Sequence, residues 1–287
     1  MKPILHTLIF LFLAFSLKGQ YNVFQTFKDT RVINVHSTEI LKAGRLDFRV
    51  GHRFGDMAGD AGGWANFYGL ENASDVKIGF EYGISDKMMI GINRTKGSSD
   101  LRQNLNALVK FKLMHQDVGT GTPFSLAVLG ISSYSTMPSG APGTLSEFQK
   151  GVHRASYHGS FIVSKKVSYR FSLQLSGAWT YRNLVQQSDR NDLVSIGAAA
   201  RFQMTKSLGL LVDTNFPVSD FRTSENGFYN PIGFGLEWDT GGGHIFQLNL
   251  TNSTGISETD FIPYTRSSWG DGEFRLGFTI SRQFTLN

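Results

Sequence analysis

The sequence predicts an all-β fold: a single transmembrane antiparallel up-and-down β-barrel of about twelve strands. Three observations predict it: strict alternation of apolar and polar residues in about twelve segments, short connections that alternate with long ones, and an apolar leader at the N-terminus. Side chains of a strand point alternately to its two faces, so each segment has one apolar and one polar face. Regular sorting of connection lengths is typical of outer-membrane barrels.

The apolar leader, residues 1–19, is predicted to be a secretory signal peptide. Met1 and Lys2 form a positive start, an apolar run covers 4–17, and cleavage is expected after Gly19. This run is too short and wrongly flanked for a membrane-spanning helix. No later stretch approaches about eighteen consecutive apolar residues, so helical spans are not expected in the rest of the chain.

The mature chain divides into an N-terminal segment, 20–43, and the barrel, 44–287. In the N-terminal segment the apolar residues, such as Phe27 and Val32, follow only a mixed periodicity. Two placements are open: a periplasmic extension, or a plug that folds into the lumen, as in many barrels. In the plug, Arg31, Glu39 and Lys42 are the residues expected to pair with charges on the wall.

The first barrel strand shows the alternation in its simplest form. Leu46, Phe48 and Val50 share one face, whereas Asp47 and Arg49 lie on the other. Large aromatic residues fall near the ends of later segments, where the interfacial girdles of a membrane barrel are expected. The alternating segments are 45–54, 76–82, 88–92, 105–113, 124–128, 157–163, 171–182, 194–202, 208–213, 232–238, 246–250 and 274–281.

The connections between these segments are sorted by length. A soluble β-sandwich also alternates, but it has no reason to place every long loop at one end. We therefore expect both termini in the periplasm, an outer-membrane location, contact with outer-membrane lipid, and barrel-assembly machinery as a partner during export. Short periplasmic turns are expected at 83–87, 116–122, 165–168, 204–207 and 239–243, and long external loops at 55–74, 96–104, 135–154, 184–191, 217–229 and 252–271.

Several short motifs are shared with a known family. They are TRVIN at 30–34, HSTE at 36–39, HRFG at 52–55, YGISD at 82–86 and KLMHQ at 112–116. The chain resembles a family of outer-membrane β-barrels of unknown function, sharply over 27–116 and by pattern afterwards. The resemblance implies the barrel and the outer membrane, and it implies no catalytic or ligand-binding residue.

Composition excludes several other classes of protein. The chain has no cysteine, which excludes an acylated cysteine anchor, disulfides and thiolate metal sites. Its net charge of +5 falls to +3 without the leader, and no basic run suggests nucleic acid. The histidines lack metal-ligand spacing, so no metal and no cofactor is expected.

Charged residues on the polar faces are expected to line the lumen. Nine basic against five acidic candidates would make an aqueous lumen favour a small anionic solute. The alternative is that these charges pair across neighbouring strands and fill the interior, because a backbone diameter of roughly 24 Å leaves a gap of about 10 Å or less between long side chains. The candidates are Arg45, Arg49, Arg53, Lys77, Lys110, Lys112, Arg182, Arg201, Arg275, Asp47, Glu81, Asp213, Glu237 and Glu273.

The favoured function is therefore a passive or weakly anion-selective, porin-like pore for transport of small solutes. The alternative is a closed structural or partner-binding barrel that acts through its external loops or a periplasmic complex. A minor alternative is a hydrolase at the outer rim using His52, Ser74 and Asp75, although no Gly-x-Ser-x-Gly motif supports it. No enzymatic activity is expected, and no catalytic residue is assigned.

Overall fold

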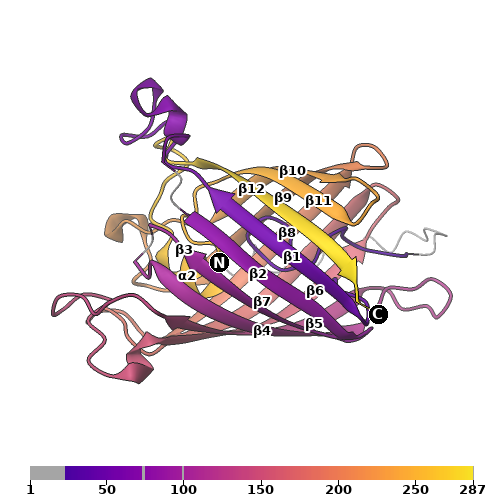
Figure 1. The fold of residues 1–287 in the computed structure, drawn as a ribbon, viewed down its shortest axis with the longest axis horizontal. Helices are drawn as coiled ribbons and strands as arrows, with labels where there is room; N and C mark the ends of the chain where they lie inside the picture. Colours follow the sequence, from indigo (N-terminus) through magenta and orange to yellow (C-terminus); the bar gives the residue numbers. More distant parts are fainter. Residues whose placement is uncertain (1–22, 73–74, 99, 287) are drawn as a thin grey trace.

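Twelve antiparallel strands close into one barrel, in which each strand pairs with the next and β12 returns to β1 (Figure 1). The computed structural model describes residues 23–72, 75–98 and 100–286, so the predicted signal peptide lies outside the described residues. The predicted fold class is confirmed. The strands are β1 (Arg45–Arg53), β2 (Asp75–Ser85), β3 (Met88–Lys96), β4 (Gln103–Met114), β5 (Ser125–Ser135), β6 (Ala155–Lys166), β7 (Phe171–Arg182), β8 (Asp192–Gln203), β9 (Leu208–Val218), β10 (Ile232–Asp239), β11 (His244–Thr251) and β12 (Arg275–Thr285).

The barrel wall is apolar outside and polar inside, the reverse of a soluble protein. In β2, Ile78 and Phe80 are 48% and 46% exposed, whereas Lys77 and Glu81, which flank them along the strand, are buried. Trp179 and Trp238 are also about half exposed on the outer face. Apolar side chains in this position stabilise the fold only where they meet lipid, which is the burial pattern of a membrane barrel.

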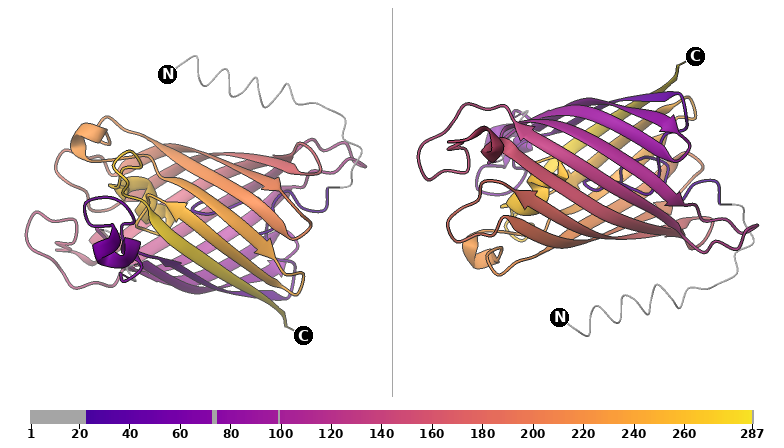
Figure 2. Two further views of the ribbon diagram at one scale, coloured as in Figure 1. Left: turned by 90° about the horizontal axis from the view of Figure 1, so that it is seen from above. Right: turned by 90° about the horizontal axis from the view of Figure 1, so that it is seen from below.

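Short turns gather at one end of the barrel and long connections at the other (Figures 1 and 2). The C-terminal strand finishes at the short-turn end, where the backbone N–H of Leu286 donates to the carbonyl of Gly44. No helix in the described ranges is long and apolar enough to cross a membrane. The helices lie in the long connections: η1 (Trp64–Gly69), η2 (Gly151–Arg154), η3 (Ser224–Asn226) and α2 (Glu258–Tyr264).

The lumen contains two apolar clusters instead of an open aqueous passage. One joins the N-terminal segment to α2 and to β8 and β9; the other packs Leu41 against β3–β6. Phe27 and Val32, whose periodicity fitted no strand, are 2% and 0% exposed. The first cluster is Phe27, Val32, Ile33, Val35, Leu193, Ala199, Leu211, Phe261 and Ile262, and the second is Leu41, Met89, Leu108, Leu129, Ile131 and Ile162.

The β11–β12 connection also folds into the barrel. The length of the connection over residues 252–271 predicts an external loop, whereas Asn252, Ser253 and every residue of α2 are buried. Phe261 and Ile262 of α2 pack in the same cluster as Phe27, because an apolar helix face of this kind stabilises the fold only when it is covered. The connection is thus internal over much of its length.

Replacing Gly83 with alanine is expected to destabilise the barrel by about 1–3 kcal/mol, the usual cost of overpacking a filled interior. A Cβ at Gly83 would lie 2.1 Å from the carbonyl oxygen of Lys42, where the N-terminal segment leaves the lumen. The free energy of unfolding in urea, measured in detergent, checks this. Gly177→Ala is the control because nothing lies within 4 Å of its Cβ, and equal losses in both variants would contradict the packing described.

Candidate functional site

The structure places most of the predicted lumen charges inside the barrel. Arg45 and Lys112 are half-buried towards the short-turn end. Glu273 is the exception: it precedes β12, and its carboxylate accepts a 2.7 Å hydrogen bond from the backbone N–H of Ser268 in the loop. Asp75, which the charge pattern did not include, is buried at the start of β2 instead. The fully buried candidates are Arg49, Arg53, Lys77, Lys110, Arg182, Arg201, Arg275, Asp47, Glu81, Asp213 and Glu237.

A tight turn in the N-terminal segment is buried inside the lumen. The backbone N–H of Val32 donates to the carbonyl of Val35 at 2.9 Å, which reverses the chain inside the lumen. Asp213 of β9 accepts hydrogen bonds from the backbone N–H groups of residues 33, 34 and 35 at 3.1, 2.6 and 3.1 Å. Its second oxygen accepts from the side-chain amide of Asn34 at 2.7 Å. One wall carboxylate therefore accepts hydrogen bonds from three consecutive backbone N–H groups of the turn and from one side-chain amide.

Wall cations hold the rest of the N-terminal segment. The Nζ of Lys110 donates to the backbone carbonyls of Thr30, Ser37 and Glu39 at 3.0, 3.1 and 2.7 Å. Arg49 forms two hydrogen bonds with the carboxylate of Asp29, at 2.7 and 2.5 Å. These contacts are buried and charge-assisted, so they are stronger than ordinary neutral hydrogen bonds.

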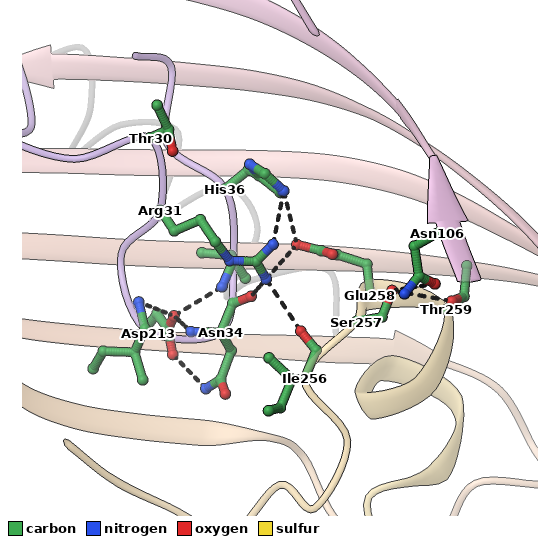
Figure 3. A network of polar contacts seen from close by, with 12 residues as sticks. Thr30, Arg31, Asn34, His36, Asn106, Asp213, Ile256, Ser257, Glu258 and Thr259 are labelled. Atoms are coloured by element: carbon green, nitrogen blue, oxygen red, sulfur yellow. Dashed lines mark hydrogen bonds and ion pairs between the residues drawn. The ribbon is translucent and has the colours of Figure 1, made fainter. Parts of the chain in front are cut away.

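The N-terminal segment and the β11–β12 connection are the two internal segments of the barrel. A buried ion pair joins them to each other (Figure 3). The guanidinium of Arg31 lies 3.1 Å from the carboxylate of Glu258, and the two side chains are only 5% and 3% exposed. Arg31 also donates to the carbonyl of Ile256 at 3.3 Å and contacts His36 at 2.8 Å. Arg53 reinforces the junction by donating to the carbonyl of Gly255 and, at 2.6 Å, to the side-chain oxygen of Asn34.

Other predicted lumen charges form ion pairs with residues of the strands or of the external loops. Arg201 and Glu237, from different strands, are 2.7 Å apart and nearly inaccessible. At the long-loop end, Asp189 contacts both Arg182 and Arg222 at 2.7 Å. Burial alone would raise the pKa of Asp189, but hydrogen bonds and charges from Arg222 and Arg182 hold it below its usual range. Pairing across strands, the alternative to an open charged lumen, thus accounts for part of the interior.

His52 and Asp75, the two described residues considered for a rim hydrolase, lie on opposite faces of the wall. His52 points outward, and its ring stacks on Phe278 with centroids 5.5 Å apart. Asp75 is buried and accepts hydrogen bonds from Ser98, while Ser74 lies outside the described residues. Within the described ranges, no group of three or more histidine, aspartate or glutamate side chains could hold a metal ion.

Two carboxylates that pair with buried cations, one on the wall and one in the N-terminal segment, could not be found from the alternation pattern. Asp29 and Glu258 belong to no alternating segment, so no periodicity pointed to them. The only available signal was the excess of basic over acidic lumen candidates, because buried charges require counter-charges or hydrogen-bond acceptors.

Comparison with known proteins identifies the family. The family model described as a membrane-bound β-barrel domain (DUF5777) matches residues 27–284, which includes most of the N-terminal segment. No curated protein matches the chain. Among solved structures, the NanC porin has a TM-score of 0.52 at 10% identity, covering 84% of this chain and 100% of the porin. The COG4313 outer membrane channel from Pseudomonas putida F1 has a TM-score of 0.50 at 12% identity, covering 86% and 98% of the two chains.

These similarities agree with the observed fold. At 10% and 12% sequence identity they support the fold alone. An even-stranded, lipid-facing barrel with short turns at one end and long loops at the other is built for the bacterial outer membrane, and the predicted location is confirmed. The resemblance noted in the sequence motifs is confirmed as well. The chain belongs to the family of membrane-bound β-barrel domains.

Proposed function

We propose that the barrel is a channel for small anionic solutes, closed in the described conformation by its N-terminal segment and its β11–β12 connection. The proposal rests on the acceptors that the wall cations bind in the closed state. Lys110 is held by three backbone carbonyls, and Arg49 by the carboxylate of Asp29. An anionic solute offers the same kind of acceptor, so the side chains that hold the closed state would line its path once the segments withdraw.

The path of the N-terminal segment is compatible with such a withdrawal. The segment reverses at residues 32–35 and leaves by the short-turn end, where Gly44 bonds Gly83 and Leu286. A loop that enters and leaves by one end can retract without threading through the barrel. Selection would then be electrostatic and steric, since basic side chains on a low-dielectric wall attract anions, and no chemical step is involved.

Replacing residues 26–39 with a glycine–serine linker tests the channel function. In planar bilayers the variant should give discrete conductance steps with a reversal potential that indicates anion preference, whereas the wild-type chain should remain mostly closed. In that variant, Lys110→Gln should reduce the preference for anions, because it removes a positive charge from the exposed wall.

Lys206→Gln is the matched control, because Lys206 is exposed in a short turn away from the lumen. It should leave selectivity unchanged. A verified, folded and inserted linker variant that conducts no ions would overturn the channel proposal, and cation preference would overturn the anionic solute.

A further inference from the structure

A small cavity remains between the internal segments and the wall, beside β1. Its charged lining consists of Arg31, Arg49, Arg53 and Lys77, and no carboxylate lines it. These four side chains are 5%, 1%, 4% and 4% exposed. Its free volume of about 20 Å³ has room for a single water molecule or a single small monatomic ion.

The four cations are not equally compensated. Arg31 pairs with Glu258, and Arg49 pairs with Asp29 and Asp47. Arg53 donates to the carbonyls of Ser253 and Gly255 and to the side-chain oxygen of Asn34, and Asp75 lies opposite it in the β1–β2 register. Within the described part of the chain, no carboxylate lies within 4 Å of the ammonium nitrogen of Lys77. Burying an uncompensated charge is costly, and a bound counter-ion removes much of that cost.

The wall leaves room for such an ion at Gly51. A Cβ at this position would lie 3.6 Å from the hydroxyl of Thr279 and 3.8 Å from the Cβ of Lys77, which are ordinary contact distances. The absent side chain therefore opens space that a small residue could fill without strain. In addition, the buried Nε of Arg49 has no hydrogen-bond partner among the described residues.

We infer that this cavity is a binding site for one small monovalent anion of about the size of chloride. The ion compensates the charge of Lys77 and thereby stabilises the closed arrangement of both internal segments. The site requires no open channel, so it can exist whether or not the barrel conducts.

Thermal unfolding of the detergent-solubilised barrel tests this site. Chloride should raise the midpoint temperature relative to gluconate at equal ionic strength, by roughly 3–5 °C for each tenfold increase above half-saturation. Gly51→Ala, which fills the cavity, and Lys77→Met, which removes a lining charge, should both abolish the chloride dependence. Gly177→Ala and Lys206→Met are the matched controls and should retain it, because they alter the outer face and a short turn.

Crystals grown in bromide provide a second measurement that does not depend on variants folding. An anomalous peak between Arg53 and Lys77 would support the site. A water molecule in the cavity without anomalous signal, or equal midpoints in chloride and gluconate, would overturn it. Neither outcome bears on conductance, so failure of the anion site is distinguishable from failure of the proposed channel.

Discussion

Glu258→Gln is expected to shift the barrel towards an open lumen, with roughly 10²–10³-fold more openings in planar bilayers than the wild type. The substitution keeps the side-chain shape but leaves Arg31 without its carboxylate at a position where both partners are nearly inaccessible. Removing one partner of a buried ion pair costs about 3–5 kcal/mol, because the remaining charge is left uncompensated. The pair joins the two internal segments, so that cost falls on the closed state (Figure 3).

The control breaks an exposed ion pair at the surface. Arg266 and Asp100 are 3.3 Å apart, but their side chains are 42% and 33% exposed, so Arg266→Gln should change conductance little. The double variant Arg31→Met/Glu258→Leu should lie closer to the wild type than either single variant, because apolar pairs often replace buried ion pairs at little cost. Equal conductance of Glu258→Gln and Arg266→Gln would contradict the role of the pair.

Asp213→Ala is expected to release the turn of the N-terminal segment. The change leaves three buried backbone N–H groups, those of residues 33–35, without an acceptor. Each orphaned group costs about 1–3 kcal/mol, so the turn should lose about 3 kcal/mol or more. Hydrogen exchange measures this directly: protection of these three amides should fall by about 10²-fold or more.

Asp239→Ala is the matched control for this variant. Asp239 forms an ion pair with Lys28 of the same segment at 3.3 Å, but both side chains are 23–30% exposed, so its loss should cost little. Unchanged protection of residues 33–35 in Asp213→Ala would show that the turn does not depend on this carboxylate.

The barrel wall was predictable because its determinants are local. In β1 and β2 the period of two sorts apolar from polar residues, and that sorting alone assigns each residue to the lipid or the lumen. The register then follows from the turns between consecutive strands. Most lumen charges were found by the same parity.

The burial of the two internal segments in the lumen was harder to predict from the sequence, because it depends on residues that are far apart in the chain. The apolar residues among 27–35 follow no strand period, and they are buried only by the distant strands β8 and β9 and by α2. One signal was present in β5, where Leu126, Ala127, Val128 and Leu129 run without alternation. A strand that is apolar on both faces needs cover on both, and Ala127 and Leu129 are 0% and 2% exposed on the inner face.

A reversible disulfide between the N-terminal segment and the wall tests closure most directly. The hydroxyls of Thr38 and Ser164 of β6 are 2.5 Å apart, which brings the side chains within disulfide reach, and the chain has no native cysteine. In the Glu258→Gln background, Thr38→Cys/Ser164→Cys should conduct when reduced and become silent when oxidised, and each single cysteine should be insensitive to oxidation. Equal conductance in the oxidised and reduced states, with the disulfide verified, would contradict closure by this segment.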